Sequence, residues 1–258
     1  MTDITNIEQN KGLKLNLVPD ILFHPGQAFK IITTYIKPVW LTPILILSIV
    51  VFLNIMVSGR IKNQLALSDE ITYPPDFQNY PPEQQAQYMQ AIQSTQGPVF
   101  TYVLPAISSL LGVWFSWLIL GGALHLVTTL VGGRGSTAIS INIVAWASLP
   151  LALREIIQFV YMLSSHKLID NPGLSGFSPA GDSGWPLFIS LTLRLIDIYL
   201  IWQVLLLIVG VRISTGLNIT KSTLSVVATI LLILIIQTGF SYLISLLGNL
   251  TITRPFFF

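Results

Sequence analysis

The chain has 258 residues, of which 52% are hydrophobic and 9% are charged. A soluble domain carries about 25% charged residues, so this chain has too few charges to cover a soluble surface, and lipid must be the solvent for most of it. The formal net charge of +2, without basic runs, excludes a nucleic-acid-binding surface, and the absence of cysteine excludes disulfides, thiolate catalysis and thiolate metal sites.

The N-terminal part has two predicted pieces. Residues 1–20 are polar and mixed in charge, which predicts a tail on the membrane surface. After Pro25, apolar residues from Ala28 to Ile36 recur at helical spacing, and polar residues lie mainly on the opposite face. This pattern predicts an interfacial N-terminal helix in the headgroup plane, and a helix that caps the bundle in water is the alternative.

Five apolar segments are long enough to span a bilayer, at about 39–57, 102–131, 138–163, 186–209 and 224–247. With the interfacial helix they predict an all-α fold, a polytopic transmembrane helical bundle of five membrane-spanning helices within residues 21–250. A short amphipathic helix is expected in the 59–99 loop, from Pro82 onward. Residues 251–258 end in three phenylalanines, which predicts an aromatic C-terminal tail at the interface.

Several residues inside the spans bear on packing. Asn54 is the only strongly polar side chain in the first span. Ser108, Gly112 and Ser116 recur every four residues in the second span, and such a small-residue stripe lets another helix approach closely. Pro150 removes a backbone hydrogen bond in the third span and predicts a kink there.

A short polar turn connects spans two and three. It contains Gly132, Gly133, Arg134 and Gly135, followed by two hydroxyl residues. The turn lacks the Gly-Lys-Ser/Thr ending and the preceding strand of a phosphate-binding loop, so nucleotide binding is not predicted. It is expected to fix the two spans side by side and to present its arginine to headgroups or to a partner.

A second polar hinge, residues 210–221, is predicted between spans four and five, and Gly210, Arg212 and Gly216 mark it. With five spans the two termini face opposite sides. With the N-terminus in the cytoplasm, the inner segments carry seven basic residues and the outer segments carry four, or five against four when Lys11 and Lys14 are left out. The positive-inside rule therefore predicts a multi-pass protein of the cell (inner) membrane with a cytoplasmic N-terminus and both hinges on that side.

Four charged residues fall inside the predicted spans: Arg154 and Glu155 in the third, and Arg194 and Asp197 in the fourth. Counted from the outer ends of these spans they lie roughly 10–15 Å deep, where an unpaired charge costs several kcal/mol. Because the two spans are antiparallel neighbours, Arg154 can pair with Asp197 and Glu155 with Arg194, and an Arg194–Asp197 pair within one helix is also open. Three interpretations remain: a neutral structural cluster, a polar site for a proton, ion or lipid headgroup, and side chains that reach outward to water.

No residues suggest catalysis or a bound cofactor. His24, His125 and His166 fall on a surface segment, the inner end of a span and an outer loop, so they cannot converge on one metal ion. The serines have no histidine and aspartate partners at a matching depth. The sequence therefore predicts no catalytic residue, no metal site and no cofactor.

Three stretches resemble the Yip1-domain family. They are 23–29 leading to the Lys37-Pro38-Val39-Trp40 step into the first span, 130–136 followed by 144–150, and 209–217. The resemblance implies a five-span helical fold with a cytoplasmic N-terminus. For eukaryotic relatives it implies roles in vesicle traffic and binding to prenylated Rab GTPases through a long cytoplasmic N-terminal region. Here that region has only about 37 residues, so the Rab role is not carried over.

The sequence thus predicts a non-enzymatic integral membrane protein that organises the membrane or scaffolds other membrane proteins. Its expected partners are the lipid bilayer and other membrane proteins or a second copy of itself. The alternative is a small transporter or channel component that uses the Arg154, Glu155, Arg194 and Asp197 cluster.

Overall fold

The computed structural model describes residues 13–35, 39–68, 77–95, 97–181 and 183–250, and these form helices and no strand. Most of the predicted N-terminal tail and the whole predicted C-terminal tail lie outside the described residues. Five described segments are long and apolar enough to cross a membrane: Leu41–Gln64, Val99–Leu130, Thr137–Ser165, Ile198–Thr215 and Ile219–Leu246. The prediction of an all-α bundle with five membrane-spanning helices is confirmed.

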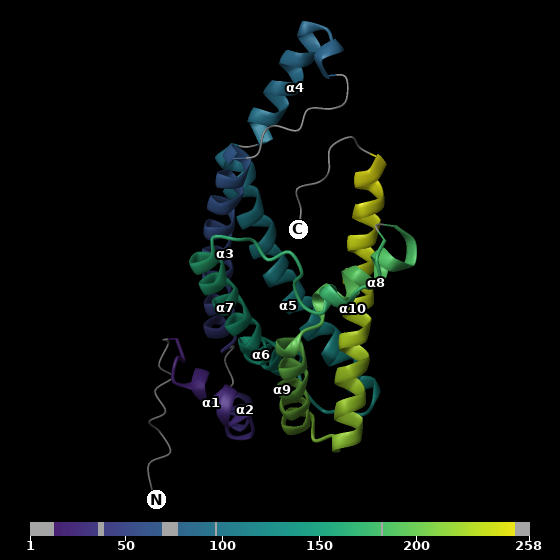
Figure 1. Ribbon diagram of the computed structural model, residues 1–258. Helices are drawn as coiled ribbons and strands as arrows, with labels where there is room; N and C mark the ends of the chain where they lie inside the picture. Colours follow the sequence, from purple (N-terminus) through teal and green to yellow (C-terminus); the bar gives the residue numbers. More distant parts are fainter. Residues whose placement is uncertain (1–12, 36–38, 69–76, 96, 182, 251–258) are drawn as a thin grey trace, which may run out of the picture.

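The helical elements are labelled in Figure 1. In chain order they are α1 (Leu17–Phe23), α2 (Pro25–Thr34), α3 (Leu41–Ser68), η1 (Phe77–Asn79), α4 (Pro82–Thr95), η2 (Val99–Val103), α5 (Leu104–Leu130), α6 (Thr137–Ala147), α7 (Leu149–Ser165), η3 (Ser175–Phe177), α8 (Gly184–Leu195), α9 (Ile198–Thr215) and α10 (Ile219–Leu250). The helix expected after Pro82 is therefore present as α4, and it projects beyond the end of α3 and α5 (Figure 1).

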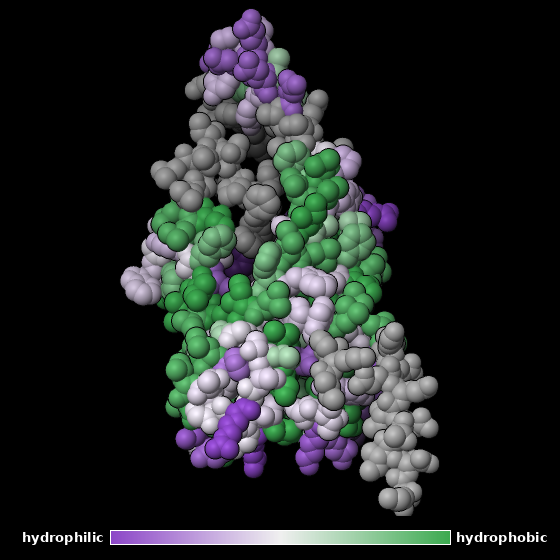
Figure 2. Space-filling view, turned by 180° about the vertical axis from the view of Figure 1, so that it is seen from behind, coloured by the Kyte–Doolittle hydropathy of each residue, from purple (hydrophilic) through white to green (hydrophobic). Residues whose placement is uncertain are grey.

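The bundle is built around α9. This helix packs against α6, α7 and α10, while α3 packs against α5 and α7, and α10 packs against α5 and α8. Figure 1 shows α3 and α7 on one side of the bundle and α10 on the other, with α8 crossing toward α10. Figure 2 shows a wide hydrophobic band around the middle and hydrophilic residues at the ends, which is the pattern that a bilayer requires.

The N-terminal helices α1 and α2 pack against the bundle. Leu17 and Ile21 of α1 and Ala28, Phe29 and Ile32 of α2 are buried, and α2 contacts α9 and α6. Pro25 occupies the first turn of α2, where its missing N–H costs no hydrogen bond. The apolar face predicted for this segment is thus largely covered by protein, and its position in the headgroup plane stays a prediction.

Three tryptophans connect the first two spans. The ring of Trp40 lies 4.6 Å from that of Trp117 and 5.8 Å from that of Trp114, centroid to centroid. The indole N–H of Trp117 donates to the carbonyl of Ile141 in α6 at 3.0 Å. These large rings therefore fill the space between α3, α5 and α6, and the polar atoms of Trp114 and Trp117 are hydrogen-bonded.

Two helix boundaries follow from single residues. The third span breaks at Ser148 into α6 and α7, and Pro150 lies in the first turn of α7, so the kink predicted there is present. The first span continues past its predicted end to Ser68. Gly59 was expected to end this span, but the helix continues through it. The glycine gives space to the ring of Tyr102, which lies 2.5 Å from the position that a Cβ would occupy.

Gly210 marks a close contact between helices, as tight as the one at Gly59. A Cβ at this position would lie 2.5 Å from Cγ2 of Ile143 and 3.2 Å from Cε1 of Phe29. The glycine lies in the middle of α9, so it is no part of a hinge. Its missing side chain lets α9, α6 and α2 meet at one point.

Gly210→Ala should lower the free energy of unfolding by about 1–3 kcal/mol, because the added methyl group overpacks this contact. The measurement is the Tm of the purified protein in detergent. Gly239→Ala in α10 is the matched control, since a Cβ there would meet nothing within 4 Å. An unchanged Tm for Gly210→Ala would show that the three helices can separate slightly without cost.

Candidate functional site

The fourth predicted span is interrupted. Instead of one helix over 186–209, the structure has α8, which ends at Leu195, and α9, which begins at Ile198. Ile196 and Asp197 between them have extended backbone. An aspartate competes with helical backbone hydrogen bonds and is among the best residues at a helix start, so the chain breaks here. The membrane-length helix is consequently α9, which is shifted toward the C-terminus relative to the prediction.

The polar backbone groups exposed by this break are satisfied locally. The carboxylate Oδ1 of Asp197 accepts the N–H of Leu200 at 2.8 Å, which caps α9. The N–H of Leu174 donates to the carbonyls of Leu193 and Ile196 at 2.9 and 3.0 Å, which caps the end of α8. Gly173 makes this approach possible, because it has φ +62 and any Cβ would lie 2.7 Å from the carbonyl oxygens of Leu193 and Arg194. Residues of the loop after α7 therefore supply hydrogen-bond partners that the broken helix lacks.

The charged residues gather beside the break. The guanidinium of Arg154 lies 3.0 Å from the carboxylate of Glu155 and 3.2 Å from that of Asp197. Asn54 donates its amide to Oε2 of Glu155 at 2.6 Å and to the backbone carbonyl of Glu155 at 2.9 Å. Only 13–14% of the two carboxylate side chains is exposed. The cluster thus links α3, α7 and α9.

Of the three predicted pairings, the structure contains one, between Arg154 and Asp197. Arg194 and Asp197 cannot pair as neighbours on one helix because the helix breaks between them. Glu155 pairs with the adjacent arginine and with Asn54 instead. Among the described residues, Arg194 has no ion pair or side-chain hydrogen bond.

The depth of the cluster can be estimated along the helices. At 1.5 Å per residue, Arg154 lies about 25 Å from Thr137 at the start of α6, and Asp197 lies about 28 Å from Gly216 at the end of α9. A bilayer core is about 30 Å thick. With the two turns at one boundary, the charges therefore lie closer to the opposite boundary than to the centre.

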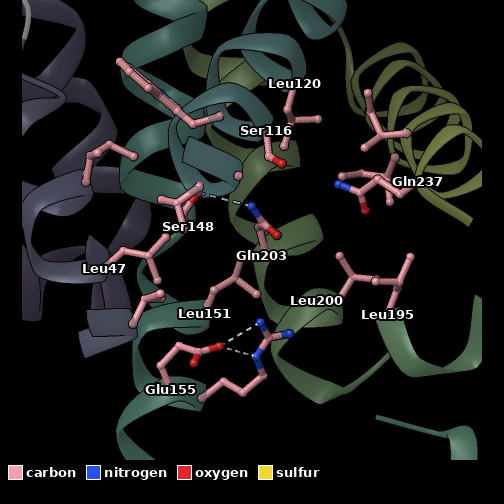
Figure 3. Close-up of a pocket in the computed structure, with 18 of the residues that line it drawn as sticks. Leu47, Ser116, Leu120, Ser148, Leu151, Glu155, Leu195, Leu200, Gln203 and Gln237 are labelled. Atoms are coloured by element: carbon pink, nitrogen blue, oxygen red, sulfur yellow. Dashed lines mark hydrogen bonds and ion pairs between the residues drawn. The ribbon is translucent and has the colours of Figure 1, made fainter. Parts of the chain in front are cut away.

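Two cavities meet at Glu155. The first has a volume of about 300 Å³ and lies among α3, α5, α7, α9 and α10. Figure 3 shows its leucine side chains with Ser116, Gln203 and Gln237, and with Glu155 at one edge. The second has a volume of about 480 Å³ and is lined by the polar residues Asn54, Ser58, Lys62, Ser109, Glu155, Gln158, Asp170 and Arg194. The second cavity is also lined by the apolar residues Val51, Ile55, Met162, Leu168, Ile169 and Pro172. A mainly apolar cavity thus shares Val51 and Glu155 with one of mixed lining.

The turn after α5 owes its shape to Gly132 and Gly133. Gly132 has φ +94, and its N–H donates to the carbonyl of Thr129, while the N–H of Gly133 donates to that of Thr128. This pairing is the Schellman arrangement that ends many helices. Ser136 then caps α6 by accepting the N–H of Ile139. The structure explains both glycines and the first hydroxyl of the predicted turn.

The second hinge is shorter than predicted. Helix α9 continues through Arg212 to Thr215 and ends at Gly216, which has φ +70. Asn218 caps α10 by accepting the N–H of Lys221 at 2.9 Å. Only residues 216–218 therefore form the connection, because the apolar residues around Arg212 continue the buried face of α9.

The two turns are joined to each other. The N–H of Arg134 donates to the carbonyl of Thr215 at 3.3 Å, and the ammonium of Lys221 donates to the carbonyl of Val131 at 3.4 Å. A Cβ at Gly135 would lie 3.2 Å from Cγ2 of Thr215. Arg134, Arg212 and Lys221 are all exposed. They form what we call the basic face, at the end of the bundle opposite the charge cluster.

No three metal-ligating side chains lie close enough together to hold an ion within the described part of the chain. In comparisons with known proteins, the family model described as the Yip1 domain matches residues 20–241, which is most of the chain. Searches of curated proteins and of solved structures found no match. The resemblance inferred from the sequence is confirmed.

Asp197→Asn should destabilise the protein less than Asp197→Leu. Asparagine keeps the oxygen that caps α9, whose loss alone costs about 1 kcal/mol. Leucine removes both the cap and the partner of Arg154, and breaking a buried ion pair costs about 3–5 kcal/mol. The Tm values of the two variants in detergent check this order, and equal losses would show that capping contributes nothing.

Valine at Gly132 or at Gly133 should each lower the yield of folded protein, for different reasons. Valine cannot easily adopt φ +94 at position 132. At position 133 its Cβ would lie 2.9 Å from the carbonyl oxygen of Thr128. The monodisperse fraction on size-exclusion chromatography measures the yield, and Gly122→Val, in open space on α5, is the control.

Proposed function

Because the chain belongs to the Yip1-domain family, we propose that it is a non-enzymatic protein that organises the membrane by holding other membrane proteins at its basic face. The observation that carries this proposal is the joining of two turns into one exposed surface with Arg134, Arg212 and Lys221. Neither turn contains an acidic residue between 130 and 138 or between 214 and 222. Within the two turns, the basic residues therefore have no acidic neighbour in the chain.

The basic face lies at one boundary of the hydrophobic band, at the end where Figure 2 shows hydrophilic residues below it. We place this face and the N-terminus in the cytoplasm of a cell membrane, as the distribution of basic residues predicts. A surface of this charge and position suits an acidic segment next to the membrane span of a partner protein. Anionic lipid headgroups would add to the attraction.

The small-residue stripe of α5 faces partly into the bundle. Ser108, Gly112 and Ser116 are exposed, and a Cβ at Gly112 would meet nothing within 4 Å. Gly112 and Ser116 also line the first cavity, so the open space beside them belongs to that cavity. The contact with a partner therefore rests on the basic face alone.

A transporter is the second candidate function, and one observation favours it. Glu155 lines both cavities, so a carboxylate connects the polar cavity near one boundary with the cavity inside the bundle. Carboxylates in such places are typical of ion and proton pathways. Against this, Glu155 is already paired with Arg154 and Asn54, as a structural cluster requires.

Photo-crosslinking from a reactive residue at Ala138, an exposed position beside Arg134, tests the proposal in native membranes. We expect adducts with membrane proteins that disappear when Arg134, Arg212 and Lys221 are all changed to glutamine, because the attraction is electrostatic. The control carries Arg60→Gln and Lys167→Gln, two exposed basic residues outside the basic face. Adducts unaffected by the first set of changes would contradict a partner held by charge.

Proteoliposomes with purified protein separate the two functions. A scaffold shows no ion or proton flux, and Glu155→Gln leaves the crosslinking unchanged. Flux that is lost in Glu155→Gln would favour the transporter.

A further inference from the structure

We propose that the polar cavity lined by Asn54, Glu155 and Arg194 binds the phosphoethanolamine headgroup of a phosphatidylethanolamine lipid. The site lies at the opposite end of the bundle from the basic face and does not depend on the scaffolding proposal. The site is distinct from the neighbouring ion pairs of Arg154 with Glu155 and Asp197. The lipid headgroup would bind to polar groups that these ion pairs do not use.

The first free group is an acceptor. Asn54 is 7% exposed, and its Oδ1 has no hydrogen-bond partner among the described residues. Its amide nitrogen donates to two oxygens of Glu155, which fixes the orientation of the amide and leaves Oδ1 as the unused end. Buried polar atoms are almost always paired, so this oxygen points to a missing N–H or O–H donor.

The second free group is a donor. Arg194 lines the same cavity and has no ion pair or hydrogen bond among the described residues. A guanidinium offers five N–H donors in a fork that suits a phosphate. Lys62, on the neighbouring helix α3, also lines the cavity and adds a second positive charge.

The charges of the cavity favour a zwitterion. Glu155 is already paired with Arg154 and Asn54. Lys62 and Arg194 are therefore left to meet a phosphate, and Asp170 is left to meet an ammonium group. A ligand with one phosphate and one ammonium group meets both signs. A primary ammonium also supplies the N–H donor that Asn54 lacks, whereas the trimethylammonium group of phosphatidylcholine has none.

The surroundings of the cavity favour a lipid over a soluble phosphoethanolamine. The cavity shares Glu155 with the first cavity, whose lining includes Leu47, Leu151 and Leu195. The charge cluster lies about 25 Å along the helices from the turns, near the boundary of a bilayer core of about 30 Å. A headgroup at this level would place its acyl chains beside the apolar side chains deeper in the bundle.

Native mass spectrometry of the full chain in detergent tests the assignment. The protein is mixed with equal amounts of phosphatidylethanolamine, phosphatidylcholine and phosphatidylglycerol of the same acyl chains. We expect phosphatidylethanolamine to bind about tenfold more tightly than either competitor, as the loss of one charge-assisted hydrogen bond predicts. Equal binding of phosphatidylethanolamine and phosphatidylcholine would overturn the proposal.

Two variants and a matched control locate the site. Arg194→Gln removes no ion pair or hydrogen bond that the described residues make, so the variant should fold. It should bind all three lipids more weakly, because each of them carries the phosphate that Arg194 would hold. Asn54→Leu should lose the preference for phosphatidylethanolamine, although it also removes the hydrogen bonds to Glu155. Arg212→Gln, at the basic face, should keep both the affinity and the preference. Unchanged binding of the three lipids by Arg194→Gln would overturn the assignment.

The soluble headgroup provides the last arm. Free phosphoethanolamine should compete weakly, because it has no acyl chains to place in the bundle. Competition as strong as that of the lipid would overturn the assignment to a lipid. The variant with three glutamines at the basic face should keep the lipid preference, so failure of the scaffold and failure of this site give different results.

Discussion

The structure depends on the requirement that backbone polar groups in lipid find partners within the protein. The break between α8 and α9 is where this requirement is hardest to meet. Asp197 caps α9, and the loop at Leu174 caps α8. The second oxygen of Asp197 holds Arg154, which in turn holds Glu155. Because these groups are hydrogen-bonded or ion-paired to one another, the break holds the loop after α7 in place. It also links α3, α7 and α9.

The two ends of the bundle consequently have different chemistry. At one end, two short turns are joined by one backbone hydrogen bond and one hydrogen bond from the Lys221 ammonium, and their basic side chains are exposed. At the other, charges of both signs line cavities, and the carboxylates of Glu155 and Asp197 are only 13–14% exposed. Exposed charges of one sign attract partners from a distance, whereas charges of both signs around a cavity select a ligand by its shape and its own charges. The two proposed functions follow from this difference.

Much of the bundle could be predicted because apolar length is a strong signal. Four of the five spans lie close to where the sequence placed them, and Pro150 kinks the third as expected. The fourth span lies further toward the C-terminus than predicted. The helix breaks within an apolar segment, and Asp197 is the residue in the sequence that indicates the break. Gly210 was interpreted as a hinge residue, although it packs against Ile143 and Phe29. A glycine in an apolar segment looks the same in either role, and only its neighbours distinguish them.

The sequence by itself determined the solvent, the number of spans, the family and the residues of the turn at Gly132, because these depend on composition and on short local patterns. The tertiary structure alone decided which charges pair, and that two turns form one surface. It also decided that Arg194 and the oxygen of Asn54 have no hydrogen-bond partner within the described parts of the chain. These outcomes depend on the relative rotation and depth of helices that are distant in the chain. No local pattern specifies such rotation, since it results from the packing of all the spans together.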